Sequence, residues 1–243
     1  MKIWRIILIV VGVTLLSCYL IVAIVLITPM TRERQCNELK VRVLDADTLR
    51  FVSSSEISYL LRHVHCVGRT LDEIDLMQME STVKKNPMID FVACYKTPSG
   101  KVTIDVKQRN PIFRVVNSEE SFYIDDKGRE MPTSVNHSVY VPVVTGYVNK
   151  HFICNELFQF IVTLQNDDFW ANQITQIYVY PNRQVELIPR MGNHIIMFGS
   201  VENAEKKLDK LLLFYQKGMP KTGWNRYSRI DLRYRDQVVC VKR

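Results

Sequence analysis

The chain has 243 residues, of which 47% are hydrophobic and 23% are charged, and this composition excludes a largely disordered protein. The net charge is +7, and the stretch from Lys217 to Arg243 supplies +6 of it, from eight Lys or Arg and two Asp. A basic end of this kind suits an acidic protein, an anionic lipid or a nucleic acid as partner.

The N-terminal region predicts a membrane anchor. Residues 1–5 form a short head, and residues 6–28 carry no charge, a length that crosses about 30 Å of hydrocarbon as a helix. A cleaved signal peptide is the alternative, but its apolar core is typically about 7–15 residues long and ends in small residues. Basic residues flank the run on both sides, so charge alone does not set its orientation. Residues 29–37 are interpreted as a linker.

The next segment, residues 38–109, predicts a domain of order β-α-α-β-β. A strand begins at Leu39, and a helix follows with Ser54 or Ser55 as N-cap. A second helix, "DEIDLMQMESTVKKNP", stops before Pro87. Two alternating strands joined by a Pro-Ser-Gly turn complete the domain as a hairpin.

Residues 110–243 predict a second domain, a mixed sheet with two packed helices, so the fold class is α+β. Alternating segments typical of strands and their turns come first: "IFRVV", "SFYID", "DKGREM" and "VYVPVVTG". The segment "FICNELFQFIVTLQ" then predicts an amphipathic helix. Three more strands follow, and then a helix capped by Ser200 and stopped by Gly218. The chain closes on two strand segments, Tyr227–Tyr234 and Gln237–Arg243.

Alternation assigns the side chains of these closing segments to two faces. One face carries Ile230, Leu232, Tyr234, Val238 and Cys240. The other face carries Arg229, Asp231, Arg233 and Arg235. A basic strand edge can also serve only to prevent aggregation, which is the purely structural interpretation of the charge.

The six cysteines lie far apart in the sequence without a C-x-x-C pair, which argues against a zinc module or a disulfide framework. Most are expected to be small buried hydrophobes. The disulfide state stays open for the five outside the apolar run: Cys36, Cys66, Cys94, Cys154 and Cys240.

Few residues suggest catalysis. "HVHC", with His63, His65 and Cys66, lacks the separated ligand pairs of a structural zinc site and is better explained as a helix end. In "HFIC", His151 precedes the helix that contains Cys154, so a thiol–imidazole pair is not expected. "DDKG" lacks the alternating ligands of a calcium loop. Without nucleotide-binding or hydrolase motifs, we expect no enzyme, cofactor, metal or small-molecule substrate.

Taken in chain order, the predicted elements and their sequence motifs resemble the FtsQ/DivIB family of bacterial cell-division proteins. "NPMIDFVACYKTPSGKVTIDVKQRNPIFRV" (86–115) looks like that family's passage from a POTRA domain into its β domain. "YIDDKGREMP" is similar to the turn near the start of the β domain, and "YSRIDLRYRDQVVCVKR" to the C-terminal strands.

The resemblance implies a non-enzymatic scaffold, anchored in the cytoplasmic (inner) membrane at the division site, with a cytoplasmic N-terminus and extracytoplasmic domains. Its partners would be single-span division proteins of the FtsB and FtsL kinds, one of which adds a strand at the C-terminal edge. Gln237 and Lys242 stand where family members carry small residues and an aromatic. The expected partner-binding residues are Arg229, Arg233, Tyr234, Arg235, Val238, Val239, Val241 and Lys242.

The charges predict that an acidic partner segment faces Arg233 and Arg235. Nucleic acid is not expected, because an extracytoplasmic domain would not meet it. The alternative hypothesis is a POTRA-bearing anchor in outer-membrane protein handling or secretion, although POTRA domains there normally occur as repeats joined to a β-barrel. A membrane-tethered enzyme is a third, weaker hypothesis.

Overall fold

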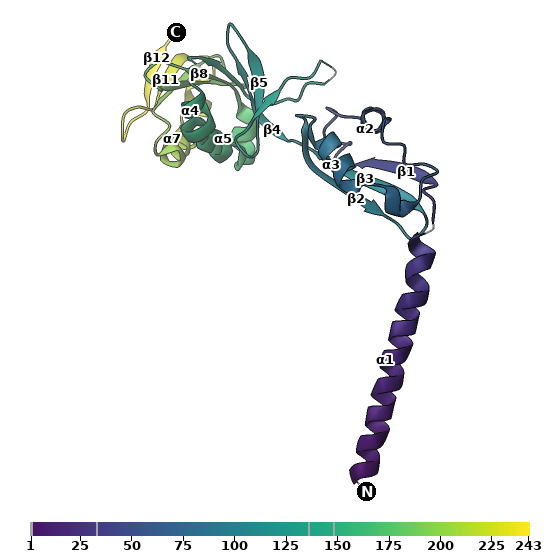
Figure 1. The fold of residues 1–243 in the computed structure, drawn as a ribbon. Coiled ribbons are helices and arrows are strands. Elements are labelled where there is room, and N and C mark those ends of the chain that lie inside the picture. Colours follow the sequence, from purple (N-terminus) through teal and green to yellow (C-terminus); the bar gives the residue numbers. More distant parts are fainter. Residues whose placement is uncertain (1, 33, 136, 148) are drawn as a thin grey trace. The chain divides into compact units, whose positions relative to one another are not determined.

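A computed structural model describes residues 2–32, 34–135, 137–147 and 149–243. The chain divides into two compact units, Met1–Gln108 and Arg109–Arg243 (Figure 1). Each unit combines helices with a sheet, in agreement with the predicted α+β class.

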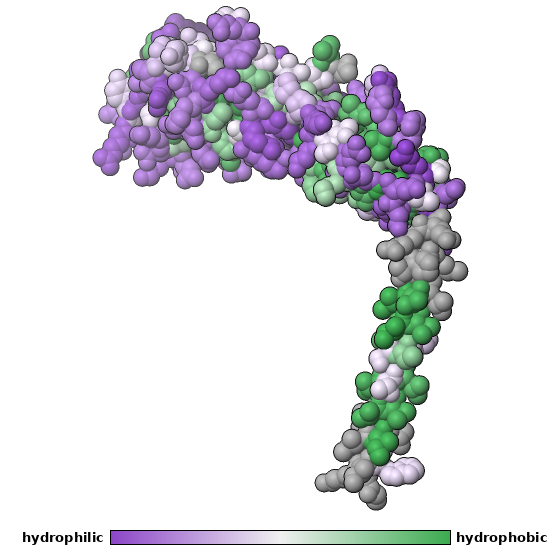
Figure 2. Space-filling model, viewed as in Figure 1, coloured by the Kyte–Doolittle hydropathy of each residue, from purple (hydrophilic) through white to green (hydrophobic). Residues whose placement is uncertain are grey.

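Helix α1 (Lys2–Arg32) opens the first unit. Its described side chains are mostly apolar and exposed, as the space-filling view shows (Figure 2). Considering only the described residues, no helix is both long enough and apolar enough to cross a membrane. The predicted span, residues 6–28, is only partly among them, because the side chains of residues 26–28 and of three residues near its start lie outside the described part.

The rest of the first unit has the predicted order β-α-α-β-β around a three-stranded sheet of order β1-β3-β2. Strand β1 runs parallel to β3, while β2 and β3 form the antiparallel hairpin. The strands are β1 (Glu38–Val43), β2 (Ile89–Lys96) and β3 (Lys101–Gln108). The helical elements are α2 (Ser54–Leu60), the 3-10 turn η1 (Leu71–Glu73) and α3 (Leu76–Lys84).

Two helix starts in this unit differ from the prediction. Ser53, rather than Ser54 or Ser55, caps α2, because Glu56 reaches back to its N–H and completes a capping box. The predicted second helix is divided into η1 and α3, since the Asp75 carboxylate accepts the N–H of Gln78 and starts a new helix there. The core beneath both helices includes Ile57, Met79, Val83, Val102, Ile104 and Val106.

The second unit contains one nine-stranded sheet of order β12-β11-β10-β9-β8-β7-β4-β5-β6. Neighbours are antiparallel except β4–β7, β7–β8 and β10–β11, which are parallel. The strands before the C-terminal pair are β4 (Pro111–Val116), β5 (Ser121–Asp125), β6 (Glu130–Pro132), β7 (Val143–Gly146), β8 (Ile174–Val179), β9 (Val185–Pro189) and β10 (Ile195–Gly199).

Two predicted helices, α5 and α7, pack together against the sheet (Figure 1). Leu208, Leu211 and Tyr215 recur at helical spacing and form an apolar stripe of α7 that is buried in the core. The helical elements are α4 (Lys150–Phe152), a π turn (η2, Ile153–Leu157), α5 (Phe158–Gln165), α6 (Asp168–Gln173), α7 (Ala204–Lys217) and α8 (Met219–Thr222).

The start of α7 differs from the prediction that Ser200 caps it. The helix begins at Ala204, and its N-cap Asn203 has the left-handed φ of 52°. The Ser200 hydroxyl instead accepts the N–H of Glu202, so it stabilises the turn before the helix. Gly218 ends α7 as predicted.

A fully buried carboxylate joins the start of the second unit to its β5–β6 turn. Asp125 Oδ2 accepts hydrogen bonds from Arg109 Nε at 2.8 Å and from Arg129 Nη2 at 2.7 Å. Its Oδ1 accepts hydrogen bonds from the backbone N–H groups of Lys127 and Arg129. Arg109 also donates to the carbonyls of Arg129 and Glu130. We call Asp125, Arg109 and Arg129 the Asp125 cluster. Its charges are paired and hydrogen-bonded, as burial requires.

Asp125→Asn should destabilise the second unit by about 3 kcal/mol, because it leaves the nearly buried Arg109 without a carboxylate. Tryptophan fluorescence during urea unfolding measures this, since Trp170 and Trp224 both lie in the second unit. Asp126→Asn, at the exposed neighbour, is the matched control and should change little. Equal midpoints for the two variants would contradict the role of the cluster.

The same carboxylate should make stability depend on pH. Burial favours the neutral acid, but hydrogen bonds from Arg129 and Arg109 outweigh it and hold the pKa of Asp125 below its usual value. Its contribution is therefore complete above the unfolded pKa of about 3.9 and is lost as pH falls through the lower folded pKa. The difference in unfolding free energy between wild type and Asp125→Asn should shrink over that acidic range. A constant difference there would show that the ionised carboxylate is not the cause.

Candidate partner-binding edge

The C-terminal stretch forms the outer hairpin of the large sheet. As predicted it has two strands, but β11 (Tyr227–Asp231) ends earlier than expected and β12 (Val239–Lys242) begins later. The two pair antiparallel, with Ile230 opposite Cys240 and Asp231 opposite Val239. Among the described strands β12 has β11 as its one neighbour, so its other side is an open edge.

The last residue fixes which peptide groups of β12 face that open side. The N–H of Arg243 donates to the Arg226 carbonyl at 3.1 Å, and its guanidinium donates to the Asn193 carbonyl. Because inward and outward peptide groups alternate along an antiparallel strand, the N–H groups of Cys240 and Lys242 face away from β11. The edge therefore presents free main-chain groups to an additional strand.

Side chains divide the edge strand into two faces. Val238 and Cys240 pack against the core beside buried Ile230, as the alternation predicts. Val239 and Val241 lie on the other face, and 38% and 52% of their surface is exposed. Arg229 is the register partner of Val241 and is exposed next to it. The outward face thus combines apolar and basic groups.

The expectation that Tyr234 shares the inward face is wrong. β11 ends at Asp231, and the chain turns at residues 235–236, so alternation does not continue to Tyr234. Tyr234 is 52% exposed.

Arg233 is paired within the chain. Its Nη2 lies 2.6 Å from Asp231 Oδ2, its Nε contacts both carboxylate oxygens, and its own N–H donates to Oδ1. Hydrogen bonding and charge raise the pKa of Arg233 and, from the other side, lower the pKa of Asp231. The Arg233 stem passes over Gly199, where an added Cβ would meet its Cγ at 2.7 Å. Gly199 also has a φ of +76°, which favours glycine.

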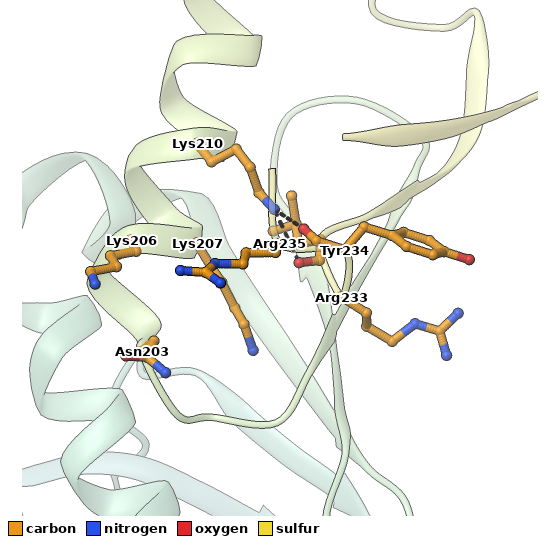
Figure 3. Close-up of a pocket in the computed structure, with 8 residues that line it drawn as sticks. Asn203, Lys206, Lys207, Lys210, Arg233, Tyr234 and Arg235 are labelled. Carbon is orange, nitrogen blue, oxygen red and sulfur yellow. Dashed lines mark hydrogen bonds between the residues drawn. The ribbon is translucent and has the colours of Figure 1, made fainter. Parts of the chain in front are cut away.

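Two lysines of α7 hold the backbone near this hairpin, and neither is predicted from the sequence. Lys210 Nζ donates to the carbonyls of Leu232 (3.2 Å) and Tyr234 (2.5 Å). Lys207 Nζ donates to those of Phe198 and Ser200. Figure 3 shows Arg235 extending toward α7, while Arg233 and Tyr234 point the other way. Lysines on a polar helix face carry no sequence signal for such contacts.

The other motifs show no site of their own. Among the described residues, no group of three or more His, Cys, Asp or Glu is placed to hold a metal. Cys66 is buried and its thiol contacts Val64 O and Met79 Sδ, whereas His63 is exposed. Burial raises the pKa of the Cys154 thiol, which is unfavourable for a nucleophile. All six cysteines are free thiols.

Comparison with known proteins identifies the family of this chain. Residues 110–241 match the family model described as FtsQ/DivIB, C-terminal related, which is more than half of the sequence. The chain belongs to the FtsQ/DivIB family. Residues 34–107 of this FtsQ/DivIB protein match a POTRA-like domain.

The search of curated proteins returned no match. Among solved structures, the chain is similar to the major extracytoplasmic domain of the trans isomer of the bacterial cell division protein DivIB from Geobacillus stearothermophilus. That similarity has 19% identity and a TM-score of 0.26, and it covers 33% of this chain and 70% of the other.

Membership of the FtsQ/DivIB family indicates a non-enzymatic role in a bacterial division complex. The alternative hypothesis, an anchor in outer-membrane protein handling or secretion, is not favoured by the matches.

Lys210→Met should loosen the β11–β12 connection, because it removes the ammonium that donates to Leu232 and Tyr234. We expect amide hydrogen exchange in residues 232–241 to become about tenfold faster, which corresponds to about 1.4 kcal/mol of local stability. Lys206→Met is the matched control, since no backbone hydrogen bond of its ammonium is found in the described part of the chain. Unchanged exchange in Lys210→Met would contradict the assignment.

Proposed function

We propose that this protein is a membrane-anchored scaffold of the division machinery that binds single-span division proteins of the FtsB and FtsL kinds. The observation that supports this proposal best is β12, an outermost strand with unpaired peptide groups and two exposed valines. The partner segment adds to the sheet as a further strand beside β12. Main-chain hydrogen bonds then supply affinity, and side chains set the register.

The exposed face of β11 and β12 determines what the partner segment carries. Val239 and Val241 favour an apolar contact, and Arg229 favours an acidic residue beside it. Alternation places Lys242 on the opposite face of β12. Arg233 contributes less than the sequence suggests, because its guanidinium is already paired with Asp231. Tyr234 is exposed and available as an aromatic contact. Binding that depends on these surface charges weakens as salt is added.

The anchor and the first unit complete the proposal. Residues 6–28 span the cytoplasmic membrane, with residues 1–5 in the cytoplasm and both folded units on the extracytoplasmic side. The POTRA-like unit helps to localise the protein at the division site. The apolar run without charge and the two domain matches support this arrangement.

Lys242→Pro tests strand addition directly. Proline removes an N–H that faces the open side of β12 and leaves the bond from Arg243 N–H to Arg226 O in place. The affinity for a peptide from the extracytoplasmic part of an FtsB-like partner should fall about fivefold or more, as expected for one lost hydrogen bond and a blocked edge. Isothermal titration calorimetry measures the change.

Lys242→Gln is the matched control, because it removes the same charge and keeps the N–H. If both variants lose affinity equally, charge rather than strand pairing explains the contact. If neither variant changes the affinity, β12 is not the binding edge.

Depletion of the protein followed by microscopy tests the cellular role. A division scaffold predicts filamentous or chained cells, since septation stops while growth continues. Normal division after depletion would refute the proposal.

A further inference from the structure

A cavity of about 330 Å³ lies between the first turns of α7 and residues 232–235. We call it the α7 pocket. Five of its lining side chains are cationic, so positive charge is concentrated around this one small cavity. The lining residues are Asn203, Lys206, Lys207, Lys210, Leu232, Arg233, Tyr234 and Arg235 (Figure 3).

Four of the five cations form no close ion pair with a carboxylate in the described part of the chain. Arg233 is neutralised by Asp231 and points away from the others (Figure 3). No ion pair among the described residues involves Lys206, Lys207, Lys210 or Arg235. Burial lowers the pKa of Lys207 and of Lys210, and repulsion from Lys210 lowers that of Lys207 further. The nearby carboxylates, Glu202 for Lys207 and Asp236 and Asp231 for Lys210, act in the opposite direction but do not cancel the lowering. An anion in the pocket would relieve this repulsion.

The cations also retain unused hydrogen-bond donors. An ammonium has three N–H groups, and Lys207 and Lys210 each give two of them to backbone carbonyls. One donor remains on each, and the Arg235 guanidinium extends toward the same helix from the opposite wall (Figure 3). Donors therefore reach the pocket from two elements, α7 and the loop that leads into β12.

We infer that the α7 pocket binds a phosphate group. A single carboxylate is planar and is best matched by the fork of one arginine, whereas phosphate is tetrahedral and directs its oxygens toward several separate donors. Lysine ammoniums act as point charges that suit such an anion. The cavity also leaves room for the group that carries the phosphate, either a small phosphorylated molecule or a lipid headgroup. This inference does not depend on strand addition at β12.

A bound phosphate would bridge α7 to residues 232–235. Since the ligand binds only the folded pocket, it stabilises the loop. Once the ligand concentration exceeds the Kd, this stabilisation grows with the logarithm of that concentration. Phosphate binding would therefore order the connection that precedes the edge strand.

Lysine acetylation followed by mass spectrometry tests the inference on the full chain in a non-ionic detergent. Inorganic phosphate, added at constant ionic strength with chloride as the replacement, should slow acetylation of Lys206 and Lys207 in a saturable way. Acetylation of Lys242, which lies outside the pocket, should not change. Arg235→Gln should raise the phosphate concentration needed for half-maximal protection at least tenfold. Arg229→Gln, which removes an arginine from outside the pocket, should leave that concentration unchanged.

Mixed micelles distinguish the source of the phosphate. Protection by phosphatidylglycerol, but not by phosphatidylcholine, in the absence of free phosphate identifies an anionic lipid headgroup. Protection by free phosphate alone identifies a soluble ligand. The inference is overturned if neither protects Lys206 and Lys207 more than Lys242, or if an oligoglutamate peptide protects them better than phosphate does. Either result leaves the Lys242→Pro test of strand addition unaffected.

Discussion

The second unit is organised around one buried negative charge. The Asp125 carboxylate uses both oxygens, one for two arginines and the other for two backbone N–H groups of its own turn. Arg109 is the first residue of the unit, so the charge fixes where the sheet begins relative to the β5–β6 turn. A neutral side chain of the same shape could not satisfy both arginines. Because β4, β5 and β6 are set there, the remaining strands extend the sheet in one direction, toward β12.

The two edge strands of this sheet differ in how well they are protected against pairing with another strand. β6 at one end has three residues, Glu130–Pro132, and carries a charge and a proline, which are common protections of an edge. β12 at the other end has exposed valines and outward peptide groups. Lys210 and the Asp231–Arg233 pair hold the connection into β12 in place. The edge is therefore open but already ordered, which reduces the entropy that a partner must overcome on binding.

Much of this arrangement could be predicted from residue periodicity. The β-α-α-β-β order, the α7 stripe and the two closing strands follow from alternation and helical spacing. The short helices α6 and α8, and the cap at Asn203, could not be predicted, because a few residues give no period. The ends of β11 and the positions of Lys207 and Lys210 depend on tertiary hydrogen bonds. Arg233 was expected to face a partner, because the sequence places Asp231 two residues earlier but does not show that the two side chains pair.

The contact between Gly199 and Arg233 links two positions that are far apart in the chain. The arginine stem occupies the space that a Cβ at position 199 would need. A larger residue at 199 would displace the arginine, leave Asp231 without its partner and alter the entry to the edge strand. Substitutions at these two positions should therefore be inherited together: lineages that lose the glycine at 199 should also replace the arginine at 233 with a shorter side chain.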